Sequence, residues 1–519
     1  MSFRVAVLVA ALAGFIALSY EILWYRAYGM VSLTAPGTFG LLLGAYLLGV
    51  ALGSIGTRAF CTTHGGSGDR RQMRSVAAFV YLANAASFLV VPALASLSTR
   101  MRWEWSLPLV AVSAGLMGAT LPLVSHFGIA PDDRAGARLS YVYVANIVGS
   151  SSGSLLTGFV FLEHLSLARV SVLLYVLGVL LCLGLVLPSY RGTYGKAAAV
   201  GLAIASVAVG VLGSGRLFDR VYEKLFFRKH FSGTERFDEL IENRHGVIAV
   251  TEGKVYGGGV YDGILNTGLR HDPNWVFRAY AISAYHPAPR HVFMVGLASG
   301  AWARIIAGLP GVEKLTVVEI NPGYLELIAR HPEVAPILRD PKVEIIIDDG
   351  RRYMARHPQG RYDAVVMNTT WHWRAHATNL LSAEFFRLVS SQLADGGIFL
   401  FNTTLSEAVM KTSATVFPHA QRIYNFMVVG RSPIVFDRGR WQGVLEGYRL
   451  DGKPLLDPAD EWDRKRMADL MAIPDTLDRP PEWEGLESRE SVLARFADLP
   501  LVTDDNMRSE WFPSDLPEE

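Results

Sequence analysis

Seven apolar stretches in the first 213 residues constrain the fold of this chain more than any other feature. Each is close to the roughly 20 residues that an α-helix needs to cross the hydrocarbon core of a bilayer. They cover approximately residues 3–24, 36–57, 75–97, 105–127, 141–162, 167–188 and 195–213. The first is longer than the apolar region of a cleaved signal peptide, so we interpret it as a retained span. The sequence therefore predicts an α-helical transmembrane bundle over residues 1–213, with the lipid bilayer as its partner.

Lysine and arginine in the short loops predict the orientation of this bundle. With the N-terminus inside, the cytoplasmic loops contain Arg4, Arg58, Arg70, Arg71, Arg74, Arg134, Arg138, Arg191 and Lys196. The opposite side contains only Arg26, Arg100, Arg102 and Arg169. This bias favours a cytoplasmic N-terminus, and seven spans then place the residues after Ser214 on the outer face. We therefore expect a multi-pass inner (cell) membrane protein whose C-terminal domain is periplasmic.

Residues 214–240 are predicted to be an amphipathic linker. The segment 217–231 combines apolar side chains with Arg220, Lys224 and Arg228, which is typical of a helix that lies on a membrane surface. If this segment crossed the membrane instead, the predicted side of the C-terminal domain would be reversed. Cys61 and Cys182 both lie in the membrane half, so cysteine content does not constrain the compartment of the rest.

Glu21 is an ionisable residue within the first predicted span. Such groups are costly inside a bilayer and suggest a transport or binding function for the membrane half. However, Glu21 lies close to Trp24 and Tyr25, which resemble an interfacial aromatic belt, and Gly149 and Gly153 are typical of close helix packing. We favour packing over transport for these residues.

Beyond the linker, the pattern becomes that of an α/β domain. Residues 246–266 alternate strand-forming and turn residues, which predicts a small antiparallel sheet in a subdomain spanning 241–290. In the domain 291–519, helical segments separate strands expected at 291–295, 315–319, 343–347, 362–367 and 398–402. This alternation predicts a Rossmann-like, mostly parallel sheet that binds ligands at the carboxyl ends of its strands.

A nucleoside-type site is predicted at the first two strand ends. The small-residue turn from Gly296 to Gly300 lets the backbone approach a ligand, and Glu319 ends the next strand where ribose hydroxyls would arrive. The third glycine of the dinucleotide fingerprint is missing, because Trp302 and Arg304 follow the turn. This difference disfavours NAD and FAD and favours S-adenosyl compounds. No basic run indicates a nucleic-acid partner.

Several motifs resemble those of the spermidine synthases, or polyamine aminopropyltransferases, and in particular the membrane-fused spermidine synthase-like proteins. The similarity spans roughly residues 241–404 and rests on Val318-Glu-Ile-Asn-Pro322, Asp349-Gly350 and Leu393-Ala-Asp-Gly-Gly-Ile398. The ending Val502-Thr-Asp-Asp-Asn506 is similar to the tail of the fused group.

The resemblance implies a transferase that uses decarboxylated S-adenosylmethionine or a related adenosyl compound. Glu319 would hold the ribose hydroxyls, and Asp349 would hold the adenine amino group. Asp349 has an alternative role as the cap of a helix. The predicted cofactor-binding residues are Gly296, Ser299, Gly300, Glu319, Asp349 and Gly350.

The chain departs from the family at the acceptor side. The family's glycine turn carries an aspartate where this chain has Ser299, and the strand that supplies its catalytic aspartate ends here in Asn368. Trp371 stands where a second acid is usual. An amide cannot act as a base, and serine and tryptophan offer no charge to a polyamine. We therefore do not expect ordinary aminopropylation of putrescine.

Residues 371–376 contain an unusual group of side chains for this position. Arginine holds carboxylates or phosphates, tryptophan stacks on sugar rings or acyl chains, and histidine acts as acid or base near neutral pH. The predicted catalytic residues are His372, His376, Arg374 and Asn368. The predicted substrate-binding residues are Trp371, Trp373, Asn402, Tyr261 and Asp262. The alternative is that this segment is a packed lid with solvated histidines. No glutamate or cysteine completes a metal site with the two histidines, so no metal is expected.

Three functional hypotheses remain open. The first is a membrane-bound spermidine synthase-like transferase with an altered acceptor site. The second is a periplasmic acid/base enzyme, a lyase or transferase acting on an anionic glycan or lipid-linked substrate without an adenosyl cofactor. The third is a transport or binding module. Glu319 and Asp349 favour the first hypothesis. The sequence carries no signal for an oligomeric state.

Overall fold

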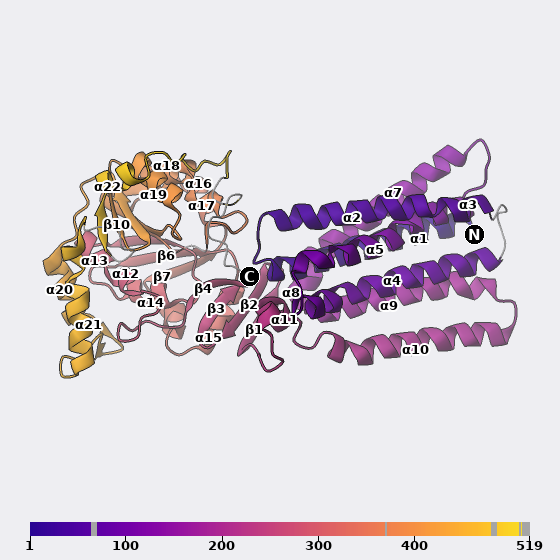
Figure 1. Ribbon diagram of the computed structural model, residues 1–519, viewed down its shortest axis with the longest axis horizontal. Helices are drawn as coiled ribbons and strands as arrows, with labels where there is room; N and C mark the ends of the chain where they lie inside the picture. The colour runs from indigo at the N-terminus through magenta and orange to yellow at the C-terminus, as the bar shows by residue number, and fades with distance from the viewer. Residues whose placement is uncertain (64–69, 369–370, 479–484, 508–509, 511–519) are drawn as a thin grey trace. The chain divides into compact units, whose positions relative to one another are not determined.

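The computed structural model describes residues 1–63, 70–368, 371–478, 485–507 and 510. The chain divides into two compact units, each described separately below (Figure 1). The first consists of Met1–Phe237 with Glu242–Val247, and the second of Asp238–Ile241 with Ile248–Glu519. Residues 511–519, the end of the predicted domain 291–519, lie outside the described residues.

The first unit is helical, as the sequence predicts. Over its described residues, seven helical spans are long and apolar enough to cross a membrane, and all seven predicted stretches are confirmed. The longer helices are α1 (Phe3–Val31), α2 (Gly37–Gly56), α4 (Arg70–Ser98), α5 (Leu107–Gly118), α6 (Thr120–Gly128), α7 (Ala135–Leu156), α9 (Leu167–Val186) and α10 (Thr193–Leu217). The shorter ones are α3 (Arg58–Thr63), α8 (Leu162–His164) and α11 (Val221–Phe227), the last of which lies in the predicted amphipathic segment.

Glycines allow two pairs of these helices to approach closely. A Cβ added at Gly149 or Gly153 of α7 would overlap a backbone carbonyl of α1. A Cβ added at Gly49 or Gly53 of α2 would likewise overlap the backbone of α5. Small residues bring helix backbones together in this way when no hydrophobic driving force acts between helices in lipid.

Polar side chains in the same unit bond between helices. Ser206 of α10 lies 2.9 Å from the hydroxyl of Tyr81 in α4 and 2.7 Å from that of Tyr175 in α9. Asn84 of α4 donates to the carbonyl of Tyr175 at 2.9 Å, and Asn146 of α7 donates to that of Ala10 at 3.1 Å. These contacts give the polar side chains a role in helix packing.

The predicted small sheet lies mostly in the second unit, with Glu242, Asn243, Gly246 and Val247 assigned to the first. Its strands are β1 (Glu239–Asn243), β2 (Gly246–Thr251), β3 (Lys254–Gly257) and β4 (Val260–Ile264), in that order. β3 pairs antiparallel with both β2 and β4.

An eight-stranded sheet forms the centre of the described part of this unit, in the order β14-β10-β11-β9-β8-β5-β6-β7. Its strands are β5 (His291–Val295), β6 (Lys314–Glu319), β7 (Val343–Ile347), β8 (Tyr362–Met367), β9 (Leu393–Asn402), β10 (His419–Ile423), β11 (Phe426–Gly430) and β14 (Leu486–Ser488). β5 to β9 pair in parallel, which confirms the predicted Rossmann-like sheet. Because β6 and β8 lie on opposite sides of β5, the strand order reverses at β5, where such sheets bind ligands.

Two features of this sheet differ from the expected pattern or go beyond it. β9 begins at Leu393 rather than at residue 398, because Leu393 pairs with Tyr362 before a register shift in β8. β10, β11 and β14 extend the sheet with antiparallel pairings that were not predicted.

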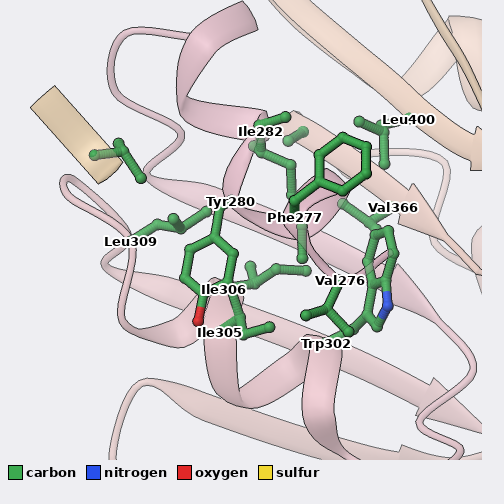
Figure 2. Close-up of a cluster of buried hydrophobic side chains, with 14 of the residues drawn as sticks. Val276, Phe277, Tyr280, Ile282, Trp302, Ile305, Ile306, Leu309, Val366 and Leu400 are labelled. Atoms are coloured by element: carbon green, nitrogen blue, oxygen red, sulfur yellow. The ribbon is translucent and has the colours of Figure 1, made fainter. Parts of the chain in front are cut away.

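Helices cover both faces of the sheet. They are α12 (Phe277–Tyr280), α13 (Ile282–Tyr285), α14 (Ala301–Ala307), α15 (Gly323–Arg330), α16 (Gly350–Arg356), α17 (Thr378–Leu381), α18 (Ala383–Gln392), α19 (Glu407–Val416), α20 (Arg438–Gly447), α21 (Glu461–Met471) and α22 (Arg489–Arg495). Alternate residues of β5 enter two cores: Met294 packs with α14, and Phe293 packs with α18. Figure 2 shows part of the first core, where Trp302 and Ile306 of α14 gather with Phe277 and Val366.

Candidate functional site

Glu319 links the turn from Gly296 to Gly300, called the glycine turn below, to the end of β6 by hydrogen bonds. Its Oε2 accepts hydrogen bonds from the backbone N–H groups of Leu297 at 2.7 Å and Ala298 at 3.4 Å. Its Oε1 accepts one from the N–H of Asn321 at 2.8 Å. The side chain is buried, and this burial raises the pKa of Glu319, while the three N–H groups act in the opposite direction. The result is a buried carboxylate at the point where the strand order reverses.

The turn itself depends on its glycines. Gly296 and Gly300 have φ angles of +85° and +77°, in the region that favours glycine. A Cβ at Gly300 would lie 2.8 Å from Ile328 Cδ1, whereas one at Gly296 would meet nothing within 4 Å. The buried Ser299 lies between these two glycines, and its Oγ is 3.5 Å from where a Cβ of Gly263 in β4 would lie. The turn is therefore packed on its helix side and open at Gly296.

Asp349 and Gly350 lie directly after β7. Asp349 caps α16, because its Oδ1 accepts a hydrogen bond from the N–H of Arg352 at 2.7 Å. A Cβ at Gly350 would lie 2.7 Å from Val295 Cγ1, so glycine is needed for this helix to pack on β5. The capping contact is thus present, and the predicted adenine contact of Asp349 stays a prediction.

A cavity of about 310 Å³ lies among the small sheet, the N-terminal end of α12 and the ends of β8 and β9. Five residues predicted from the sequence line it: Tyr261, Asp262, Asn368, Trp371 and Asn402. Asn402 Nδ2 donates to Asn368 Oδ1 at 3.0 Å. The cavity also includes Gly263, which connects it to Ser299 of the glycine turn.

Asp262 is the carboxylate of this cavity. It accepts a hydrogen bond from the hydroxyl of Tyr324, and its Oδ1 lies 3.6 Å from Nη1 of Arg374. Burial raises the pKa of Asp262, and Arg374 and Tyr324 counteract this rise. Asp262 therefore already has a cation and a hydroxyl as partners.

Four predicted site residues of the segment 371–376 do not appear in the lining of the cavity over the described residues: His372, Trp373, Arg374 and His376. His372 is buried, its N–H donates to Thr404 Oγ1 at 2.8 Å, and its Nδ1 is 3.0 Å from the Thr404 carbonyl oxygen. Trp373 is buried and stacks on Trp371 with 6.3 Å between ring centroids. Arg374 faces Asp262 as described.

His376 is the most exposed member of this segment. Its φ is +70°, and its backbone N–H donates to Oε2 of Glu510 at 2.9 Å. The catalytic roles of His372, His376 and Arg374 therefore stay predictions. Trp371 is the member that the structure brings together with Asn368.

Sequence reasoning missed Asn274, Trp275, Arg278 and Asn425, which also line the cavity. Arg278 belongs to a four-residue helix, and Asn425 to the tight connection between β10 and β11. The one available signal was the turn-rich run 272–275 before a short helix, because turns before helices often line sites.

Residues 281–428 match the protein family described as the spermine/spermidine synthase domain. This chain contains a spermine/spermidine synthase domain. The match includes the glycine turn, Glu319, Asp349, Asn368 and Asn402, and so confirms the family resemblance in the C-terminal part. Tyr261 and Asp262 of the small sheet precede it.

Curated relatives of the synthase domain are polyamine aminopropyltransferases. That of Desulforudis audaxviator (strain MP104C) is 35% identical over 144 residues, which are 26% of this chain and 52% of the relative. That of Aeropyrum pernix is 26% identical over 251 residues, covering 43% of this chain and 77% of the relative. The chain thus spans about half the length of the first of these relatives.

A solved structure similar to the synthase domain is a spermidine synthase in complex with the transition state analogue AdoDATO. It is 16% identical with a TM-score of 0.35, and the similarity covers 42% of this chain and 81% of that chain. For metal ions, the described residues contain no group of three or more His, Cys, Asp or Glu side chains that would hold one.

Proposed function

We propose that this chain is a membrane-bound transferase of the spermidine synthase type that alkylates an acceptor other than putrescine. The observation that supports this proposal is Asn368. It lines the cavity beside the glycine turn, at the position where the family resemblance places a catalytic aspartate. Glu319 provides the acid expected on the donor side, where the adenosyl compound would bind. Asn368 replaces the base expected on the acceptor side, where the alkylated molecule would bind.

The residues of the donor side fit an adenosyl compound such as decarboxylated S-adenosylmethionine. Glu319 is a buried carboxylate held at a strand end, and the turn is open at Gly296, where a ligand approaches the backbone. Glu319 would hold the ribose hydroxyls, and Asp349 would lie near the base. When bound, a sulfonium donor supplies an electrophilic carbon, and the protein positions the acceptor.

The acceptor side is poorly suited to a polyamine. Putrescine carries two ammonium groups, and one must lose a proton before its nitrogen can attack. The Asn368 amide cannot accept that proton. Asp262 is already matched by Arg374 and by the hydroxyl of Tyr324. These contacts support an acceptor that needs neither a carboxylate base nor an acidic binding surface.

We expect the purified full-length chain in nanodiscs to bind methylthioadenosine, measured by calorimetry. Glu319→Gln should weaken binding by roughly 1.5–3 kcal/mol, the contribution of hydrogen bonds to a charged group. Glu326→Gln is the matched control, because Glu326 is exposed on α15 and pairs with Arg330. A folded preparation that does not bind methylthioadenosine would contradict the proposal and favour an acid/base enzyme that reuses the fold.

The same binding should depend on pH. The ionised Glu319 accepts the ribose hydroxyls, and burial raises its pKa above the ordinary 4.5. Acidification should therefore protonate Glu319, and weaken binding, at a higher pH than for an exposed glutamate. Calorimetric titrations between pH 7 and 4.5 would show this loss in the wild type and a much flatter profile in Glu319→Gln. A wild-type affinity that is constant over this range would contradict it.

We also propose that the synthase domain is periplasmic. The charge bias and the seven spans support an N-terminus inside and the residues after Ser214 outside. An export-dependent reporter fused after Glu519 should be active, and a reporter that requires the cytoplasm should be silent. The opposite result would reverse the proposed topology.

A further inference from the structure

Two asparagine side chains connect the buried Arg278 to Asn368. Nη1 of Arg278 donates to Oδ1 of Asn425. Asn425 Nδ2 donates to Asn402 Oδ1 at 3.0 Å, and Asn402 Nδ2 donates to Asn368 Oδ1 at 3.0 Å. All four residues line the 310 Å³ cavity, and we call them the amide chain.

The direction of the amide chain is determined at two points. A guanidinium only donates, so Asn425 must turn its oxygen towards Arg278 and its nitrogen towards Asn402. Independently, the backbone N–H of Thr404 donates to Oδ1 of Asn402 at 2.8 Å. Both constraints give Asn402 the same orientation, so its nitrogen meets the oxygen of Asn368. The amide chain therefore ends in the cavity with the NH₂ group of Asn368, which is a hydrogen-bond donor.

Arg278 carries a buried positive charge, and the described carboxylates around it do not form an ion pair with it. It is 3% exposed, and its other hydrogen bonds go to the backbone carbonyls of Trp275 and Asn274, each at 2.8 Å. Within the described part of the chain, no Asp or Glu forms an ion pair with it. Its guanidinium also lies 4.1 Å from the centre of the Phe426 ring. Burial lowers the pKa of Arg278 to about 9, so it remains charged at neutral pH.

Each of the two carboxylates nearby has a closer cation than Arg278, and Asp272 also acts on Arg278 at longer range by raising its pKa. Asp262 lies 3.6 Å from Arg374, and Asp272 lies 3.8 Å from Arg466 while also accepting hydrogen bonds from two backbone N–H groups. Buried charges are costly unless they are paired. One positive charge and one amide donor therefore remain for a ligand in the cavity.

We propose that the acceptor bound in this cavity carries a carboxylate, which the Asn368 amide and the Arg278 end of the amide chain recognise. This inference rests on the proposed function, because it names the class of acceptor for the same site. A single negative charge matches Arg278, the arginine that lines the cavity and forms no ion pair with the described carboxylates. Trp275, Trp371 and Tyr261 provide aromatic walls for the rest of the molecule.

Putrescine and 4-aminobutyrate form a matched pair of probes, because a carboxylate in the second replaces an aminomethyl group in the first. The full-length chain in nanodiscs, saturated with methylthioadenosine, should bind 4-aminobutyrate at least about tenfold more tightly than putrescine, as measured by calorimetry. Arg278→Gln and Asn368→Asp should each reduce this preference about tenfold or more. Arg278→Lys keeps the charge and should retain part of it.

Arg290→Gln is the control, because Arg290 is 67% exposed and pairs with Glu313 on the surface. It should leave the preference unchanged. The affinity for methylthioadenosine is measured on every variant, and it should stay within about threefold of the wild type. A variant that is merely misfolded would lose both ligands, whereas loss of carboxylate recognition changes only the ratio of the two probes. If Arg278→Gln does not fold, the wild-type ratio and Asn368→Asp decide the question.

The outcomes separate the two proposals. Absence of methylthioadenosine binding overturns the proposed function. Normal methylthioadenosine binding with putrescine bound as tightly as 4-aminobutyrate overturns the carboxylate inference alone. Tighter binding of propyl phosphate than of 4-aminobutyrate would also overturn it, because the ligand class would then be a phosphate.

Discussion

The wild-type chain should release methylthioadenosine from decarboxylated S-adenosylmethionine very slowly when putrescine is the acceptor. General-base catalysis contributes on the order of 10²–10⁴ in rate, and Asn368 cannot supply it. The expected rate is therefore lower by this factor than that of the polyamine aminopropyltransferase of Desulforudis audaxviator, assayed in parallel. Chromatographic detection of methylthioadenosine gives the rate for both proteins.

Asn368→Asp alone should not restore this activity. The new carboxylate would lack the second acid, because Trp371 remains, and Ser299 still offers no charge to the amine. It would also join an amide chain whose other end is the buried Arg278. If Asn368→Asp gave aminopropylation of putrescine near the reference rate, the amine site would be intact and an altered acceptor would be the wrong interpretation.

The same assay tests the predicted histidines once an acceptor such as a carboxylate compound is turned over. His372→Gln should lower the rate if His372 exchanges protons with the substrate, although its ring nitrogen Nδ1 already faces Thr404. His376 is exposed and away from the cavity lining, so His376→Gln offers a comparison within the same segment. Near-normal rates in both variants would favour the packed-lid reading of residues 371–376.

The proximity of the glycine turn and Glu319 was predictable because it follows from the order of strands. Parallel strands end at one edge of a sheet, so a turn after β5 and an acid at the end of β6 must lie near each other. The same rule placed Asn368 and Asn402, which end neighbouring strands, in one cavity. The regular geometry of the sheet made these predictions independent of loop conformation.

The rest of the site depends on loops and on antiparallel additions that this rule does not cover. Arg278 and Asn425 are 147 positions apart in sequence, and they meet only because β11 pairs with β9 and brings the β10–β11 connection to the cavity. In the segment 371–376, closeness in sequence does not bring the side chains together. Consecutive residues in a turn point in different directions, so Trp371 enters the cavity lining while His376 is exposed.

Replacing Glu487 should lower the free energy of unfolding more than any other single substitution of a buried residue that we consider in the α/β unit. Glu487 lies in β14 and is 5% exposed, next to Arg422 of β10, which is 3% exposed. Its Oε2 accepts from Nε of Arg422 at 2.6 Å and from Nη2 of Arg495 at 2.7 Å. Glu487→Ala would leave the buried guanidinium of Arg422 without its carboxylate. Breaking a buried ion pair in this way costs about 3–5 kcal/mol.

Calorimetric unfolding of the full-length chain in nanodiscs measures this loss. Glu490→Ala is the matched control, because Glu490 lies in the first turn of the next helix, is 80% exposed and lies 4.0 Å from Arg489, where an ion pair contributes little. Replacing both partners, as in Arg422→Met with Glu487→Leu, should recover most of the loss, because the buried guanidinium of Arg422 is then removed together with its carboxylate. If Glu487→Ala were as mild as Glu490→Ala, the pair would not hold β14 against β10. In that case the edge of the sheet would depend on the packing of Leu486 and Val492 instead.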